Sequence, residues 1–307
     1  MSSHLTDDLI ESLKRITAIP VSQATFTDDI LVDFLNDELI STITPILMDI
    51  REEFMIDYVD YDLSSVGTTL TIPSNTVGER LRDVVMVTTA TNGDESYTNL
   101  PKLSIESLSS AFNEGSNISN SGFIIQGNTV KLYPQSGWGD VTVRLYYYRR
   151  PNDLCLVADA AKITQITPGT LTATVNVVPS SWVIGTELDS IQDNQPFGTT
   201  NTALEITNIA GQNIVLDSVD GLVVGDYLSL TGTAPLAQVP KEAQRLLVQS
   251  TKVQILESLD DDKNHKLAKA KYDSLLTDFL KAVTNRVEGQ PKKIVSKNNI
   301  FNATRAR

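Results

Sequence analysis

Two stretches of helical periodicity, one near each end of the 307-residue chain, enclose a long middle region with a β-strand pattern. Near the N-terminus, apolar residues recur every three or four positions, as in Leu9, Leu13 and Ile16. The same spacing returns over residues 240–283. Amphipathic helices must bury their apolar faces, and each set offers the other a partner. The sequence therefore predicts one helical domain assembled from both ends of the chain.

Start signals divide the N-terminal helical region into three predicted helices. Thr6 and Thr27 are each followed by two aspartates, which favours an N-cap at both positions. Thr44-Pro45 resembles an N-cap followed by proline at the first helical position, so a third helix is expected to begin there. Pro240 is expected at the first position of the C-terminal helices.

Residues 57–151 are rich in β-branched and aromatic residues, which is typical of strands. A hairpin is expected to turn at Gly127-Asn128, and an alternating strand at 141–147. Residues 100–113 have the pattern of one short helix. These elements predict a small α+β insertion.

Residues 155–236 contain few charges and many short β-rich runs separated by turn residues. A spacing near ten residues predicts a small antiparallel barrel or sandwich. The segments "PSSWVIGTELDSI" (179–191) and "VDGLVVGDYLSL" (219–230) are loosely alike. Their likeness is too weak to establish a repeat from sequence.

The predicted fold class is α+β, a helical bundle from the two terminal segments with β-rich insertions. The predicted domains are a helical domain of residues 1–56 plus 240–288, a small α+β insertion of residues 57–154, a barrel-like insertion of residues 155–239 and an extended C-terminal tail of residues 289–307.

Charge is distributed unevenly along the chain. The net charge is −13, and residues 1–62 alone hold fourteen acids and three bases. Residues 288–307 instead hold one acid and five bases. An acidic body is a poor candidate for wrapping DNA, because that affinity comes from cations that neutralise phosphates. A basic tail on an acidic body favours docking onto an acidic partner or onto another copy.

Sequence motifs for catalysis and for metal or cofactor binding are absent. There are two histidines and one cysteine, and no HExxH, CxxC, GxxxxGK[ST], strand-linked GxGxxG or GxSxG. Cys155 is expected to be a buried small residue near a strand end. The Asp260–Asp262 run is expected to be a turn between helices rather than a cation site. We therefore expect no enzyme activity, catalytic residue, metal or cofactor.

The first residues have no apolar segment of the secretory type, and no apolar run reaches membrane-spanning length. These features favour synthesis in a cytoplasm and no membrane association.

The stretch "LYYYRRP" (145–151) leaves two alternatives open. It could be an edge strand that closes the α+β unit. It could also contact another subunit through Tyr146, Tyr148, Arg149 and Arg150, because exposed aromatic and arginine side chains stack on partners.

Residues 9–63, "LIESLKRITAIPVSQATFTDDILVDFLNDELISTITPILMDIREEFMIDYVDYDL", resemble the N-terminal region of head-to-tail connector (adaptor) proteins of tailed bacteriophages. Residues 146–164 also resemble a segment of phage structural proteins that precedes a small β-barrel. The resemblance implies a virion protein of the neck, at the head–tail junction, without catalysis. It implies a homo-oligomeric ring, commonly of twelve copies, that binds the portal above and tail or nozzle components below. Packaged DNA would pass through the ring without sequence-specific binding.

The resemblance further implies that the C-terminal segment docks on the portal. Its expected contact residues are Lys292, Lys293, Lys297, Asn299, Ile300, Phe301, Arg305 and Arg307. The alternative interpretation is a tail- or fibre-associated binding module that uses the β domain at 155–236.

Overall fold

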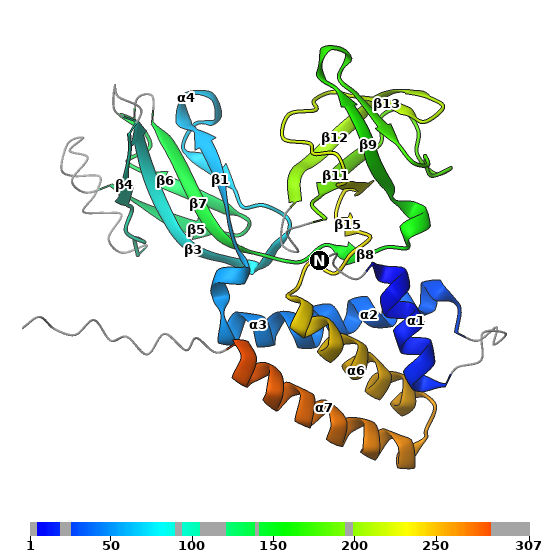
Figure 1. Cartoon of the computed structure of the whole chain (residues 1–307). Helices are drawn as coiled ribbons and strands as arrows, with labels where there is room; N and C mark the ends of the chain where they lie inside the picture. Colours follow the sequence, from blue (N-terminus) through cyan, green and yellow to red (C-terminus); the bar gives the residue numbers. More distant parts are fainter. Residues whose placement is uncertain are drawn as a thin grey trace, which may run out of the picture.

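The fold places two β-rich units side by side on a layer of helices (Figure 1). A computed structural model describes residues 5–18, 26–89, 94–104, 121–138, 141–193 and 199–283. The helical layer consists of α1 (Thr6–Thr17), α2 (Asp28–Glu38), η1 (Leu39–Ile43), α3 (Thr44–Ile50), α6 (Lys241–Ser258) and α7 (Asp262–Val283). Helices from both ends of the chain share one core that includes Leu13, Leu35, Leu247 and Phe279.

The predicted break between the second and third helices is absent, because α2, η1 and α3 form one continuous helix. Pro45 lacks an N–H and would clash with the carbonyl one turn earlier. The chain accommodates it with the π-helical turn η1, in which the Thr44 N–H donates to the Leu39 carbonyl. The Thr44 hydroxyl donates to the same carbonyl at 2.7 Å. Thr44 is thus an interior residue that stabilises the widened turn.

The other predicted helix starts had mixed outcomes. Thr27 is the N-cap of α2, since its Oγ1 accepts from the Ile30 N–H. Thr6 is instead the first helical residue and is buried, with Leu5 in the N-cap position. The Thr6 N–H donates to the Pro235 carbonyl at 2.8 Å, and the Leu5 N–H donates to Asp8 Oδ2 at 3.2 Å, so a tertiary contact adds to a local bond at this helix start. Pro240 is an N-cap rather than the first helical residue of α6.

The α+β unit is a sandwich of two antiparallel sheets. One sheet has the order β1-β7-β3-β4 and the other β2-β6-β5. A core that contains Leu70, Val130 and Leu145 lies between them. The strands are β1 (Ile56–Asp62), β2 (Thr69–Thr71), β3 (Thr76–Thr89), β4 (Glu95–Asn99), β5 (Gly122–Gln126), β6 (Thr129–Tyr133) and β7 (Thr142–Arg149), with the short helices η2 (Glu52–Phe54) before β1 and α4 (Leu63–Val66) after it.

The predicted hairpin at Gly127-Asn128 is confirmed by the pairing of Gln126 with Thr129. The prediction of a helix at 100–113 mostly falls outside the described residues, and residues 100–104 are not helical. The edge-strand alternative for "LYYYRRP" is wrong, because β7 pairs with β1 on one side and with β3 on the other. Its continuous apolar and aromatic composition fits this central position.

Six strands, from β9 to β14, form a closed barrel in the order β10-β13-β12-β11-β14-β9, which resolves the barrel-or-sandwich prediction. Inward-facing residues such as Ile163, Leu188, Ile206 and Leu228 fill its interior. The strands are β9 (Ala161–Thr167), β10 (Thr172–Val175), β11 (Glu187–Ile191), β12 (Thr199–Ala210), β13 (Asn213–Leu216) and β14 (Tyr227–Leu230). Two 3₁₀ turns, η4 (Val157–Asp159) and η5 (Pro168–Thr170), flank β9.

The barrel has an internal two-fold pseudosymmetry that relates β9-β10-β11 to β12-β13-β14. Exchanging these two sets of strands reproduces the same cyclic strand order. Hydrogen bonds repeat as well: the Gly185 N–H donates to the Ile206 carbonyl at 2.8 Å, and the Gly225 N–H donates to the Ile163 carbonyl at 2.9 Å. The loose likeness of residues 179–191 and 219–230 therefore reflects a structural repeat.

A short parallel pair, β8 (Asp153–Leu154) with β15 (Thr233–Ala234), joins the barrel to the helical layer. Beneath it, Asn152 Nδ2 donates to the buried Asp189 carboxylate at 3.1 Å, and the Gly232 N–H donates to the same carboxylate oxygen at 2.8 Å. The Asn152 N–H donates to Gln238 Oε1 at 2.9 Å. These bonds satisfy the polar groups buried at the entry and exit of the barrel.

Candidate functional site

The predicted tail contacts, Lys292 to Arg307, lie outside the described residues. Within the described part, α7 extends to Val283.

The second predicted contact stretch lies at the junction of the sandwich with the helical layer. Tyr148 is buried in the helical core, and its hydroxyl donates to Glu52 Oε2 at 2.6 Å. Arg149 is also buried, with Nη1 3.7 Å from Asp57 Oδ2, and burial lowers the pKa of its guanidinium. These two side chains therefore serve contacts within the chain. Arg150 is exposed and Tyr146 is half-buried, so only they present a surface for another subunit.

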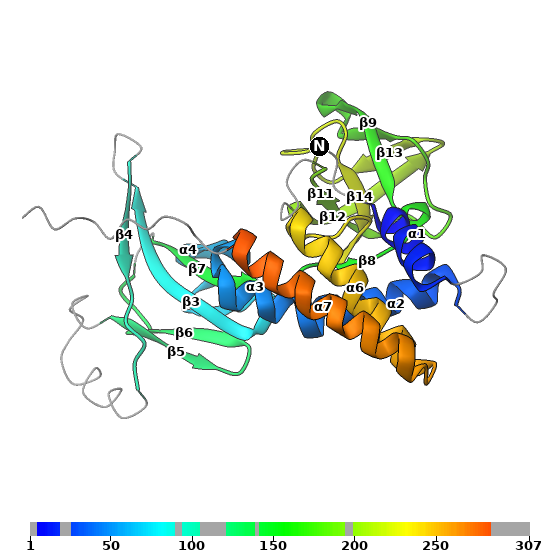
Figure 2. The same ribbon diagram turned by 60° about the horizontal axis from the view of Figure 1, so that its bottom comes forward.

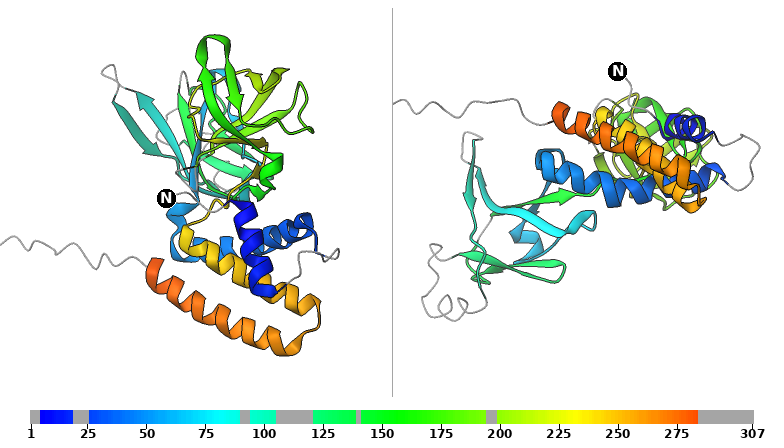
Figure 3. Two further views of the ribbon diagram at one scale, coloured as in Figure 1. Left: turned by 45° about the vertical axis from the view of Figure 1, so that its right-hand side comes forward. Right: turned by 90° about the horizontal axis from the view of Figure 1, so that it is seen from below.

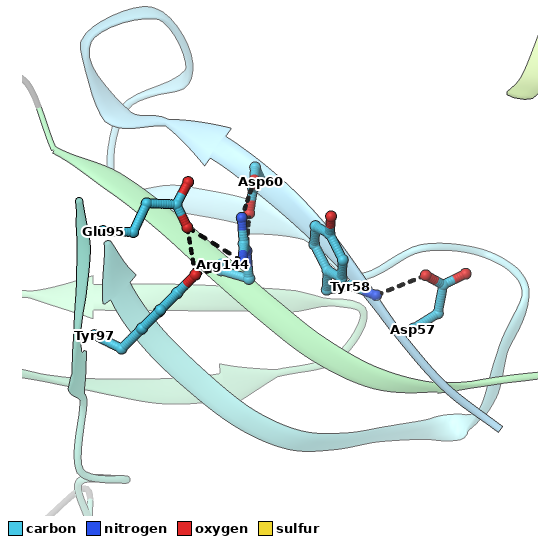
Figure 4. A network of polar contacts seen from close by, with 6 residues as sticks. All are labelled: Asp57, Tyr58, Asp60, Glu95, Tyr97 and Arg144. Atoms are coloured by element: carbon cyan, nitrogen blue, oxygen red, sulfur yellow. Dashed lines mark hydrogen bonds and ion pairs between the residues drawn. The ribbon is translucent and has the colours of Figure 1, made fainter. Parts of the chain in front are cut away.

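An exposed cluster centred on Arg144 occupies the outer face of the four-stranded sheet (Figure 4). Two bonds of 2.7 and 2.8 Å join Arg144 Nε and Nη2 to the two carboxylate oxygens of Asp60, which is its direct cross-strand partner. The guanidinium carbon lies 4.2 Å from the ring centroid of Tyr58 and 5.6 Å from that of Tyr97. Glu95 completes this Arg144 cluster by accepting from the Tyr97 hydroxyl.

The electrostatics of the Arg144 cluster follow from these contacts. The hydrogen bonds to Asp60 raise the pKa of the Arg144 guanidinium above its usual value. The hydrogen bond to Glu95 raises the pKa of the Tyr97 hydroxyl. Arg144 is therefore a cation between the carboxylates of Asp60 and Glu95.

The Arg144 cluster has the composition of a protein-contact surface. Tyr58 and Tyr97 are each 52% exposed, although the guanidinium holds both rings in place. Rigid, exposed tyrosine and arginine side chains are enriched in protein interfaces. The cluster contains no nucleophile beside a general base, so it offers binding rather than acid–base chemistry. An alternating pattern in the sequence indicates this surface, since Arg144 and Tyr146 alternate with the inward Val143 and Leu145. Only the register, however, identifies Asp60 and Tyr58 as their partners.

A cleft of about 700 Å³ separates the sandwich from the barrel. Its lining includes the carboxylates Asp57, Glu187 and Asp189 and the ring of Tyr147. Burial, reinforced by the charge of Asp57, raises the pKa of Tyr147 to about 12. This negative, aromatic surface suits a cationic side chain better than an anionic ligand.

Two equivalent loops of the barrel expose apolar pairs. Val183 and Ile184 precede β11, and Val223 and Val224 precede β14, with all four side chains more than half exposed. Because the internal pseudosymmetry relates the two loops, the barrel presents the same apolar feature twice.

Within the described ranges, no group of three or more His, Cys, Asp or Glu side chains could hold a metal ion. Asp260 and Asp261 lie in the predicted turn between α6 and α7, whereas Asp262 is the first residue of α7, and Asp261 Oδ1 caps α7 by accepting from the Asn264 N–H. Among those same residues no helix has the length and apolar character needed to cross a membrane.

Comparison with known protein families gives a match over more than half of the chain. Residues 6–186 match the family model described as SU10 adaptor protein. The matched range begins at α1, includes the strands of the sandwich and ends immediately before β11. A search of the curated proteins found no match.

Proposed function

The chain belongs to the SU10 adaptor protein family, and from this membership we propose that it is a structural protein of a bacteriophage virion. In this proposal, copies of the chain form a ring beneath the portal in the neck. The ring joins the capsid to the tail, surrounds the DNA channel and performs no catalysis. The family match over residues 6–186 is the observation that carries the proposal.

Docking on the portal is assigned to the basic C-terminal tail. Ile300 and Phe301 would supply apolar anchors, while Lys292, Arg305 and Arg307 would pair with portal acids. One short peptide binds weakly, because binding must offset its ordering entropy. A ring of tails on a ring of sites converts later contacts into intramolecular ones, which raises overall affinity steeply.

The acidic character of the body supports passage of DNA without adhesion. With a net charge of −13, a ring of copies repels the phosphate backbone rather than neutralising it.

Mass photometry of the purified protein, alone and mixed with isolated portal rings, tests this function. We expect a complex whose added mass is a whole number of adaptor copies. Deletion of residues 290–307 should abolish the complex while the circular dichroism spectrum keeps its shape. If the full-length protein does not bind the portal rings, the proposed function is wrong. If the truncated protein binds them equally well, the proposed role of the tail is wrong.

The alternative function, a tail- or fibre-associated binding module, has one observation in its favour. The barrel exposes the pairs Val183-Ile184 and Val223-Val224, which are apolar surfaces without a partner among the described residues. Replacing all four with serine discriminates between the two functions. The adaptor proposal expects portal binding to persist, whereas a module that acts through its barrel should lose its binding partner.

A further inference from the structure

A groove of about 220 Å³ runs along the helical layer between α1, α6 and α7. Its walls are apolar, formed by Leu9, Ile16, Val248 and Leu275. The groove belongs to neither predicted contact surface. Its floor and rim nevertheless carry polar groups that have no partner among the described residues.

Gln244 of α6 lines the floor of this groove and is only 1% exposed. Neither Oε1 nor Nε2 of its amide has a hydrogen-bond partner among the described residues. Buried polar groups in native proteins are nearly always satisfied, so an amide with two unmet groups in a groove indicates a missing ligand. The neighbouring Gln249 is satisfied, because its Nε2 donates to the Ala268 carbonyl at 2.9 Å.

The rim of the groove is positively charged, although the net charge of the protein is −13. Arg15, Arg245 and Lys271 line it, and no carboxylate does. All three are exposed, and none forms an ion pair with any described residue. A groove with apolar walls, a cationic rim and a free amide is complementary to an apolar segment that carries carboxylates.

The exposed face of α2 has this complementary composition. Asp29, Asp33 and Asp37 are exposed and spaced four residues apart, so they form one stripe along the helix. Ile30 and Ile40 flank the stripe and are also exposed. The three aspartates form no ion pair among the described residues.

The groove and the α2 face cannot meet within one copy. Leu31 and Leu35 turn the opposite side of α2 into the core, so the stripe points away from α6. Seen from below, α7 crosses over the α2–α3 helix (Figure 3, right; compare Figure 2). A contact between these two surfaces therefore joins one copy to the next, head to tail, and such contacts close into rings when their rotation permits.

We propose that the groove between α1, α6 and α7 binds the exposed α2 face of a second copy of this chain. Asp33 and Asp37 of one copy face Arg15, Arg245 and Lys271 of the next, and Gln244 hydrogen-bonds to the inserted segment. This inference rests on the proposed ring, and it names the surfaces that hold neighbouring subunits together.

Charge reversal on each surface tests the contact. The groove variant is Arg15→Glu with Lys271→Glu, and the face variant is Asp33→Lys with Asp37→Lys. Each alone should weaken self-association at least about tenfold in low-salt sedimentation, because like charges then oppose each other. An equimolar mixture should recover it, since alternating copies restore opposite charges at every contact. Lys102→Glu on the exposed surface of the sandwich is the matched control and should change nothing.

Recovery in the mixture also shows that both variants are folded. The proposal is overturned if either variant associates as the wild type does, if the mixture fails to recover, or if the wild type does not self-associate. Portal binding by the same variants separates this outcome from the proposed function. A wild type that binds portal rings while its variants assemble normally retains the function and loses only the groove contact.

Discussion

Asn36 in α2 forms a pair of hydrogen bonds with the backbone of Leu154, although the two residues are 118 positions apart. Its Oδ1 accepts from the Leu154 N–H at 2.6 Å, and its Nδ2 donates to the Leu154 carbonyl at 3.1 Å. The side-chain amide thereby bonds to the backbone of β8 as a neighbouring strand would. This contact ties the N-terminal helices to the segment that enters the barrel.

Replacing Asn36 with alanine should lower the free energy of unfolding by about 1–3 kcal/mol, because two backbone groups at a part-buried position lose their partner. Urea denaturation followed by circular dichroism measures the change. Asn208→Ala is the control, since Asn208 is exposed and its side chain accepts a hydrogen bond from the N–H of the next residue, Ile209. Equal effects of the two substitutions would contradict a role of Asn36 as a tie between units.

Arg144→Ala should lower the free energy of unfolding by about 1–2 kcal/mol, through loss of the paired bonds to Asp60 and of the ring contacts. Arg144→Lys should recover only part of this loss, because an ammonium cannot form the bidentate geometry. Thermal melts at low and at 1 M salt check both effects, with a smaller difference expected at high salt. The exposed Arg150→Ala is the matched control on the same chain segment, and an equal loss there would contradict the assignment.

The alkaline limit of stability should depend on Tyr147. Burial raises its pKa from 10.0 to about 12, so the unfolded chain releases this proton first as the pH rises. The corresponding stability is fully present below pH 10 and is lost between pH 10 and about 12. Denaturant melts should show a shallower decline for Tyr147→Phe than for the wild type in this window. Parallel declines would contradict the shifted pKa.

Cys155 is half-buried rather than fully buried as predicted, yet burial raises its thiol pKa from 9.0 to about 12. The thiolate is the reactive form, so the folded protein should react with a disulfide reagent at pH 8 at least about tenfold more slowly than the unfolded protein. A spectrophotometric thiol assay with and without denaturant measures the two rates. Equal rates would show that the folded chain exposes the thiolate.

Local sequence signals predicted those features of the fold that depend on local physics. Examples are the Gly127-Asn128 turn, the N-cap at Thr27 and the alternation of the barrel strands, each of which depends on a few neighbouring residues. Features set by distant partners were missed. Pro45 is tolerated because η1 widens the helix, and β7 is central because β1 and β3 flank it.

The candidate surfaces divide in the same way. The alternation in "VTVRLYYY" marks Arg144 as outward-facing, but its partners Asp60 and Tyr97 come from other strands. The groove that contains Gln244 requires three helices from both ends of the chain, so no single stretch of sequence indicates it. The two-fold pseudosymmetry of the barrel left only faint sequence similarity, because the repeated hydrogen bonds involve backbone groups.

The pseudosymmetry predicts paired energetic costs at Gly185 and Gly225. Both glycines have positive φ, +87° and +105°, and a Cβ at either position would meet no atom within 4 Å. Alanine at each position should therefore lower the free energy of unfolding by about 1–2 kcal/mol through backbone strain alone. The two decreases should be similar. Gly169→Ala is the control, since it also has open space but lacks positive φ, and it should be neutral or stabilising by up to about 1 kcal/mol. Urea melts of the three variants measure these differences. A large cost at one of the two loop glycines and none at the other would contradict the prediction, because equivalent turns under equal backbone strain should lose equal stability.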